Sequence, residues 1–526
     1  MVRNSKTACH TCRRRRLRCD EAKPHCQRCA TEGVECLGYG KMLLWVDGVA
    51  SRGKMMGKTF IEGSKITKAS QTDPSPAFNA QTSNQLSTTH HGHDTHVVAS
   101  PTPSTLYTSL LDPWLQQMDY NTRHYLAHFL TNVGNDLIVH NLPSHQPNPL
   151  RVLLEFSQQS SALFNVIVAM SAHHQHNLLL GTPNAHTHQI HGLLCKGKAL
   201  QLLSREITHL SPSNYTTLLA SSMLLSEMAL LELGDDTWRI HVGAAARLVR
   251  GITLSSSSLA PDGMSVEAST FCSWMISRLV IQDMFGSSLS AITANCDLQQ
   301  VWGPGRGIDR ALRIAELDHY SSCPAQISQL ILAASALPAT ALTYSSCCED
   351  RGGGDPVITQ CIFVSLQQFD PGDWALTLQP RTPTDDFTER YHIASAYKAA
   401  AALYISQIIP DDDRICAHRP TQPDDLVRDI LSHISLIPRS NPLFKSSIWP
   451  ICIAGAETTD PQHRAAVLSH LRTLSIEIRW QSTYGAEQAL KAFWERIDTL
   501  PEQKEPHRAR RWLDEFRAMG VSIYPA

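Results

Sequence analysis

Apolar residues recur at helical spacing over most of the chain from about residue 108 onward. Near the start of this region Tyr125, Leu126, Phe129, Leu130 and Val133 recur three or four positions apart, as on one face of a helix. The same pattern predicts further helices over 149–179, 186–208, 214–233, 264–287, 388–408, 423–436, 445–458, 460–480, 485–498 and 507–518. Residues 108–526 are therefore expected to form one large all-α helical domain.

Turn and capping residues separate several of these helices. Gly234 is a candidate C-cap after the helix at 214–233, and Asp236 is suited to begin the next helix, which contains Trp238. Strand signals are scarce. The one candidate is a short strand at Val357–Val364, in a stretch whose glycines and prolines otherwise indicate a long loop.

The first 107 residues lack this periodicity. Residues 61–105 are rich in Ser, Thr, Gln, Asn, His and Pro and poor in large apolar residues, which is the composition of a disordered segment. A glycine-containing basic connector without coiled-coil heptads precedes them. No stretch reaches 18 apolar residues, so no membrane span is expected. The expected organisation is a small module at 1–40, a basic connector and disordered linker at 41–107, and the helical domain at 108–526.

Six of the 15 cysteines form a doubled pattern in the small module. The unit C-x2-C-x6-C occurs twice, and its members are Cys9, Cys12, Cys19, Cys26, Cys29 and Cys36. Structural zinc takes four thiolates in a tetrahedron, so six thiolates suit two zinc ions if two of them bridge. So short and polar a segment cannot fold by apolar burial alone, and metal binding would supply the folding energy. A disulfide framework is the alternative, but the chain shows no signal peptide.

The second and third cysteines enclose five arginines in six positions: Arg13, Arg14, Arg15, Arg16 and Arg18. If residues 12–18 form a short helix, arginines three or four positions apart share a face and Leu17 points inward. Arginine reads guanine edges in the major groove with two hydrogen bonds, while neighbouring cations hold phosphates. A nuclear-localisation signal or a non-specific basic tract is the alternative.

The charge distribution also favours a head that meets nucleic acid. Residues 1–70 contain 15 Lys and Arg against 6 Asp and Glu, a net charge of +9, whereas the rest of the chain contains 31 against 42, a net charge of −11. The common catalytic motifs are missing. The glycine run at 303–307 follows no convincing strand, and Pro304 lacks a backbone donor that a phosphate loop needs. An enzymatic role is not expected.

Residues 9–36 resemble the fungal zinc binuclear cluster of sequence-specific transcription regulators, a module that places a helix in the major groove. The resemblance implies two zinc ions per chain. It also implies that Cys9 and Cys26 are the bridging thiolates and that the other four cysteines are terminal ligands.

The same resemblance assigns roles to the basic residues. Arg15 and Arg16 occupy the positions that read a CGG-type triplet, where much of the family has lysine, and Arg13 and Arg18 lie near phosphates. The candidate DNA contacts are Arg13, Arg14, Arg15, Arg16, Arg18 and Lys23.

The helical region resembles the second type of fungal-specific transcription factor domain at 238–246, 449–457 and 511–516, and the connector resembles the acriflavine-sensitivity-control branch. The resemblance implies a nuclear regulator of RNA polymerase II transcription that binds double-stranded DNA and contacts the transcription machinery. One small module touches about one triplet, so a homodimer or a DNA-bound partner is expected. The expected role is a pathway-specific activator, for example of a secondary-metabolite gene cluster. The alternatives are a nutrient- or drug-response regulator, a repressor, or a zinc-docked helical scaffold that does not read bases.

Overall fold

The computed structural model separates the chain into two compact units, Met1–Ser100 and Pro101–Ala526. In the first unit it describes residues 8, 9, 11, 12, 15, 17–23, 26–32, 34 and 36. In the second unit it describes 113–139, 148–234, 236–253, 266–290, 308–337, 355–378, 386–409, 422–499, 511–520 and 522–525. The predicted linker at 41–107 and the glycine run at 303–307 lie outside the described residues.

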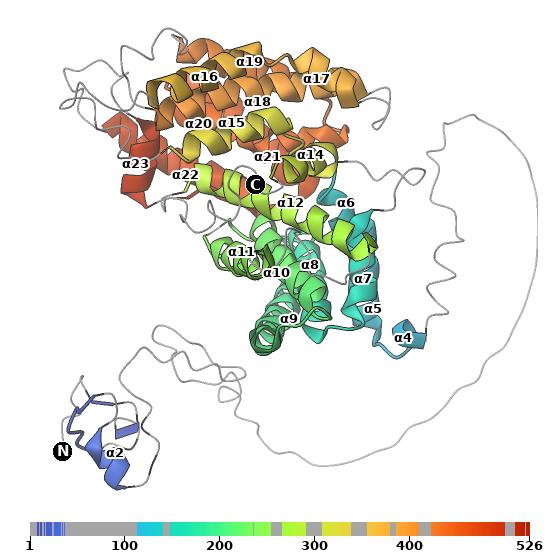
Figure 1. The fold of residues 1–526 in the computed structure, drawn as a ribbon, viewed down its shortest axis with the longest axis vertical. Coiled ribbons are helices and arrows are strands. Elements are labelled where there is room, and N and C mark those ends of the chain that lie inside the picture. The colour runs from blue at the N-terminus through green and yellow to red at the C-terminus, as the bar shows by residue number, and fades with distance from the viewer. Residues whose placement is uncertain are drawn as a thin grey trace, which may run out of the picture. The chain divides into compact units, whose positions relative to one another are not determined.

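The regular elements described in each unit are helices (Figure 1). The first unit contains α2 (Gln27–Thr31). The second contains α4 (Pro113–Gln116), α5 (Tyr120–His128), η2 (Phe129–Val133), α6 (Gly134–Asp136), η3 (Pro149–Arg151), α7 (Val152–Ser157), α8 (Ser161–Leu178), α9 (Ala185–Glu206), η4 (Ile207–His209), α10 (Tyr215–Leu231), α11 (Trp238–Thr253), α12 (Val266–Ser288), α14 (Ile308–Asp318), α15 (Ala325–Ser335), α16 (Asp355–Gln368), α17 (Pro371–Leu378), α18 (Phe387–Ile408), α19 (Pro423–Ser435), η7 (Pro442–Ser447), α20 (Ile448–Glu457), α21 (Pro461–Ile478), α22 (Gln481–Thr499) and α23 (Trp512–Met519).

The expected fold class is confirmed: a cysteine-rich module and a large helical domain. Among the described residues the only β-type pairing is an isolated antiparallel bridge between Ile138 and His319. Over the same residues, no helix combines the length and the apolar character that crossing a bilayer requires.

Helix α10 is the centre of the N-terminal half of the large domain, and every one of its residues is buried. It packs against α8, α11, α12 and α22. Two of its serines have partners inside the core: Ser221 Oγ donates to the Thr217 carbonyl at 2.7 Å, and Ser226 Oγ bonds to the side chain of Gln282 on α12. Such hydrogen bonds lower the cost of burying these serines inside the core.

Helix α12 runs between α5–α11 and the later helices of the domain (Figure 1). Near its end, Phe285 lies 5.0 Å from the ring of Trp449 on α20, and Tyr397 on α18 stacks on the same tryptophan at 5.6 Å. The Trp449 Nε1–H donates to Ser288 Oγ at 2.8 Å. The two halves of the domain therefore share one continuous core.

The C-terminal residues pack against the start of α11, near Asp236. The Asp236 carboxylate accepts a hydrogen bond from Ser522 Oγ at 2.7 Å and pairs with Arg239 at 3.2 Å. The ring of Tyr524 packs 5.2 Å from that of Trp238. The predicted C-cap at Gly234 is wrong, because α10 ends at Leu231 and its cap is Glu232. Gly234 has φ +74° and lies in the turn that follows, where glycine adopts this conformation without strain.

The candidate strand at Val357–Val364 is wrong, because these residues belong to α16. Ile362, Phe363 and Leu366 are buried at helical spacing, and α16 packs against α15 and α18. A short apolar run does not distinguish a strand from a buried helix, which explains the error. The predicted long loop around this region is also interrupted by α17, and α14 and α15 lie outside the predicted helical ranges.

Candidate metal centre and nucleic-acid interface

The two half-repeats of the cysteine motif form the same set of contacts. In the first, the Cys12 N–H donates to Cys9 Sγ and the Cys9 N–H donates to Cys19 Sγ, both at 3.4 Å. In the second, the Cys29 N–H donates to Cys26 Sγ and the Cys26 N–H donates to Cys36 Sγ, again at 3.4 Å. The sequence repeat is therefore also a structural repeat, in which backbone N–H groups point at sulfur atoms.

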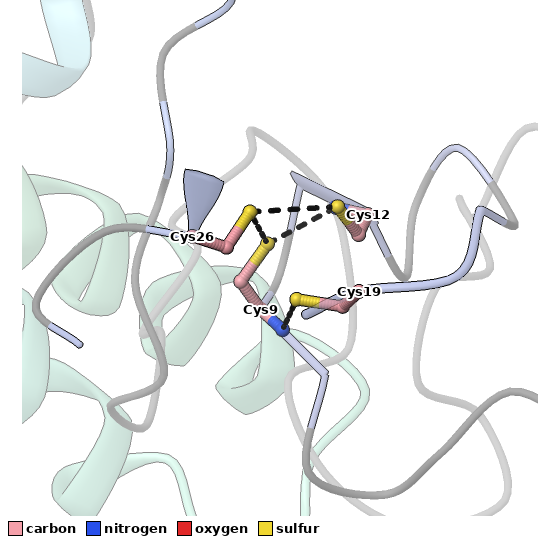
Figure 2. Close-up of side chains that lie close together, drawn as sticks. All are labelled: Cys9, Cys12, Cys19 and Cys26. Carbon is pink, nitrogen blue, oxygen red and sulfur yellow. Dashed lines mark hydrogen bonds between the residues drawn. The ribbon is translucent and has the colours of Figure 1, made fainter. Parts of the chain in front are cut away.

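The sulfur atoms of the two halves meet in the middle of the module (Figure 2). Cys9 Sγ lies 3.5 Å from Cys26 Sγ, and Cys12 Sγ lies 3.7 Å from Cys26 Sγ and 3.8 Å from Cys29 Sγ. Two sets of four cysteines have sulfur atoms within 4.8 Å of one another. They are Cys9, Cys12, Cys19 and Cys26, and Cys9, Cys26, Cys29 and Cys36. Cys9 and Cys26 belong to both sets.

These distances fit zinc. A tetrahedron with Zn–S bonds of about 2.3 Å has sulfur atoms about 3.8 Å apart, close to the contacts observed here. They are far longer than a disulfide bond of about 2.05 Å, and none of the six cysteines forms a disulfide. Among the described residues, only these two cysteine sets have the geometry to hold a metal ion. The donor set therefore fits zinc, and the disulfide alternative fails.

Metal binding would have to change the protonation of the thiols. Burial raises the pKa of the Cys9 thiol to about 12 and raises the pKa of Cys12 above its usual 9.0. Thiols in this environment would stay protonated at neutral pH unless a divalent cation stabilised the thiolates. The metal would thus be bound with release of protons and would supply folding free energy to a module whose buried centre is mainly cysteine.

The described residues of the arginine run, Arg15, Leu17 and Arg18, are not helical. Thr11 and Cys12 are helical, the Arg15 N–H donates to the Thr11 carbonyl at 3.0 Å, and the Leu17 N–H donates to the Cys12 carbonyl at 2.9 Å. Residues 17–20 are not helical, so the expected helix does not extend to residue 18. The cause is the metal site, because the chain must turn back to bring Cys19 Sγ to the Cys9 N–H.

The described basic candidates all lie on the surface. Arg15, Arg18 and Lys23 are exposed, and Leu17 is half-buried as expected. Arg13, Arg14 and Arg16 lie outside the described residues.

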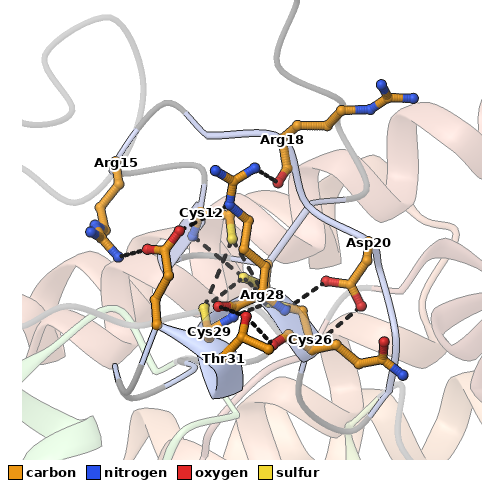
Figure 3. A network of polar contacts seen from close by, with 11 residues as sticks. Cys12, Arg15, Arg18, Asp20, Cys26, Arg28, Cys29 and Thr31 are labelled. Atoms are coloured by element: carbon orange, nitrogen blue, oxygen red, sulfur yellow. Dashed lines mark hydrogen bonds and ion pairs between the residues drawn. The ribbon is translucent and has the colours of Figure 1, made fainter.

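A polar network joins the two half-repeats and includes residues that the sequence analysis missed (Figure 3). The Glu32 carboxylate contacts Arg15 Nη1 at 2.6 Å and Arg28 Nε at 3.1 Å. Arg28 Nη1 also donates to the Arg18 carbonyl at 3.1 Å. The hydrogen bond from Arg28 lowers the pKa of Glu32 below its usual 4.5 and keeps it ionised. The i,i+4 spacing of Arg28 and Glu32 was a signal available in the sequence.

Asp20 links the start of α2 to the end of the arginine run through two hydrogen bonds. Its two carboxylate oxygens accept hydrogen bonds from the N–H groups of Gln27, at 2.9 Å, and Arg28, at 3.2 Å. The Gln27 hydrogen bond lowers the pKa of Asp20 below its usual 3.8. A carboxylate at the first turn of a helix is favourable, so Asp20 orients α2 relative to the first half-repeat.

Comparison with protein families matches both units of the chain. The fungal Zn(2)-Cys(6) binuclear cluster domain matches residues 7–44, and the fungal specific transcription factor domain matches residues 124–524. No solved structure matches the chain.

One relative is similar over nearly its whole length. The acriflavine sensitivity control protein acr-2 of Neurospora crassa is 26% identical over 98% of this chain and 96% of its own. Other relatives match only a short stretch of this chain. The pestheic acid cluster transcriptional regulator 3 of Pestalotiopsis fici is 49% identical over 8% of each chain. The aspercryptin biosynthesis cluster-specific transcription regulator atnN of Emericella nidulans is 54% identical over 7% of this chain and 6% of its own.

The two family matches cover the module with paired cysteine sets and the helical domain behind it, as the resemblance implied. The chain therefore belongs to the fungal transcription factors that combine a Zn(2)-Cys(6) binuclear cluster with a fungal specific transcription factor domain, and it is a regulator rather than an enzyme.

Proposed function

We propose that the chain binds two zinc ions and uses the resulting module to read a CGG-type triplet in double-stranded DNA. The observation that carries this proposal is the pair of four-cysteine sets that share Cys9 and Cys26. One zinc ion would be held by Cys9, Cys12, Cys19 and Cys26, and the other by Cys9, Cys26, Cys29 and Cys36. When bound, zinc supplies charge that stabilises the thiolates and holds the half-repeats together.

The arginines supply the DNA contacts in this proposal. Arg15 and Arg16 read base edges, and Arg13, Arg14, Arg18 and Lys23 contact phosphates. The exposure of Arg15, Arg18 and Lys23 supports it, as does the net charge of +9 over residues 1–70. A solvent-exposed guanidinium is available to DNA, whereas a buried one would not be.

The protein acts in the nucleus, as a homodimer or with a DNA-bound partner, and contacts the transcription machinery. Dimerisation follows from size, because one module that reads a single triplet is too small for typical specific affinity. The relatives named as regulators of the pestheic acid and aspercryptin clusters favour control of one biosynthetic pathway, which in this proposal the chain activates. The full-length similarity to an acriflavine sensitivity control protein favours a drug-response regulator as the second candidate.

Binding-site selection from random DNA with the zinc-loaded full chain tests the base-reading step. Arg16→Ala should reduce discrimination at one position of the selected triplet by about 1–3 kcal/mol, the contribution of one bidentate arginine–guanine contact. Arg205→Ala removes the same charge from the exposed surface of α9 and should leave the selected site unchanged. An Arg16→Ala protein that binds all sequences more weakly, with an unchanged preference, would show that the run contacts phosphates alone.

A further inference from the structure

Glu32 links the arginine run to the second half-repeat. It is the cap residue at the end of α2, and its two carboxylate oxygens have different partners. Oε2 accepts from Arg15 Nη1 at 2.6 Å, and Oε1 accepts from Arg28 Nε at 3.1 Å. The same carboxylate therefore touches an arginine proposed to read bases and an arginine of the scaffold.

The scaffold side of this contact is well anchored. Arg28 donates from its backbone N–H to Asp20 at 3.2 Å and from Nη1 to the Arg18 carbonyl at 3.1 Å. Arg28 thus connects α2 to the chain segment that follows the arginine run (Figure 3). Because Glu32 is held by this fixed partner, its second oxygen sets the position of the Arg15 guanidinium.

The contact leaves Arg15 able to bind a base. A guanidinium has five N–H donors, and Glu32 takes a donor on Nη1 alone. The edge formed by Nε and Nη2 can still donate two parallel hydrogen bonds, as a guanine contact requires. A long side chain that is already restrained loses less conformational freedom when it binds, so the restraint favours the correct contact.

The charge of Glu32 affects overall affinity rather than selectivity. A carboxylate next to the arginine run repels phosphates wherever the module sits on DNA, so it lowers affinity for every sequence. Because this repulsion is the same for all sites, the selectivity depends on the restraint that Glu32 places on Arg15. We infer that Glu32 is a positioning residue that orients Arg15 and sharpens the selectivity of the module for its own site. The inference rests on the proposed function of Arg15 as a base-reading residue.

The test compares affinities of the zinc-loaded full chain for the selected site and for a scrambled site of equal length. Glu32→Gln should lower the ratio of the two affinities by about 1.4- to fivefold, the range for a solvent-exposed ion pair. Glu35→Gln makes the same change in net charge within the same half-repeat and should leave the ratio unchanged. A second variant, Glu32→Asp, keeps the charge but is one methylene too short to reach both arginines, and it should lower the ratio as well.

A double-mutant cycle with Arg15→Ala assigns the effect to Arg15. In that background Glu32→Gln should no longer change the ratio. The inference is overturned if Glu32→Gln and Glu32→Asp, each with two zinc ions bound, keep the wild-type ratio, or if the effect persists without Arg15. A wild-type protein that selects no site at all would instead overturn the proposed function, so the two failures are distinguishable.

Discussion

Replacing Arg278 by methionine should severely destabilise the helical domain. Arg278 on α12 and Glu227 on α10 form an ion pair in which both side chains are 0% exposed. The Arg278 Nη2–H also donates to the Leu137 carbonyl at 2.8 Å, and the guanidinium lies over the Trp274 ring at 5.1 Å from its centroid. The Arg278 side chain therefore links α12 to α10 and to Leu137, the residue that caps α6.

The magnitude follows from leaving a carboxyl group buried without its partner. Removing one member of a buried ion pair costs about 3–5 kcal/mol, out of a typical total stability of about 5–15 kcal/mol. Burial already raises the pKa of Glu227 above its usual 4.5, with Arg278 opposing the shift. Without Arg278 the pKa of Glu227 rises further in the folded state. A carboxyl group whose pKa is raised in the folded state contributes stability that is fully present below pH 4.5 and is lost as the pH rises. The loss of stability in Arg278→Met should therefore be larger at pH 8 than at pH 5.

Denaturant titration of the full chain, followed by tryptophan fluorescence at both pH values, measures this deficit. Glu227→Leu with Arg278→Met replaces both charges by apolar groups and should recover most of the lost stability. Arg428→Met removes an exposed arginine that pairs with Asp425 at 2.8 Å, and it should cost no more than about 0.5 kcal/mol. The reasoning is refuted if Arg278→Met is as mild as Arg428→Met, or if the double variant is as unstable as the single one.

Three further predictions concern packing, pH and the metal. Gly286→Ala should cost about 1–3 kcal/mol of stability by overpacking, because a Cβ there would lie 2.5 Å from a ring carbon of Trp238. The control Gly197→Ala meets open space and should be neutral or stabilising. Equal melting temperatures for the two variants would contradict this prediction. His128 shares a buried hydrogen bond with His174 at 2.8 Å, and burial lowers the pKa of His128 to about 3, so stability should fall as the pH drops from about 6.5 towards 3. His128→Gln should flatten that part of the stability curve, and an unchanged curve would exclude His128 as its cause. A chelator should release two zinc ions per chain and abolish DNA binding while the helical circular dichroism signal persists, because only the cysteine module depends on metal to fold. Loss of most of the helical signal would contradict this prediction.

The cysteine repeat shows how much of the candidate site can be predicted from the sequence. Equal spacing predicts equal local structure, and the contacts within the first half-repeat recur at the same distances in the second. The contacts of Glu32 with Arg15 were not predictable in this way, because they depend on how the half-repeats face each other. The end of the helical turn before Leu17 likewise follows from the return of Cys19 to Cys9, which spacing alone does not describe.

The helical domain likewise contains helices that the apolar pattern predicts and helices that it does not. Helices with apolar residues on a regular face, such as α19 and α21, agree with the predicted ranges within a few residues. α16 was misassigned because its apolar run is short, and its burial against α15 and α18 rather than its own pattern makes it a helix. α14 and α15 went unpredicted, although Ile308, Leu312 and Ala315 are buried at helical spacing on α14.

The most direct test of the central claim is genome-wide occupancy of the tagged protein in its own host, compared with its Arg16→Ala variant. If the zinc module reads DNA through its arginines, the wild-type protein should occupy sites that contain the selected triplet, and these peaks should disappear in the variant. Peaks confined to one contiguous set of biosynthetic genes would assign the regulator to that pathway. Occupancy that survives Arg16→Ala at the same sites would mean that a partner reads the DNA, and it would contradict the account.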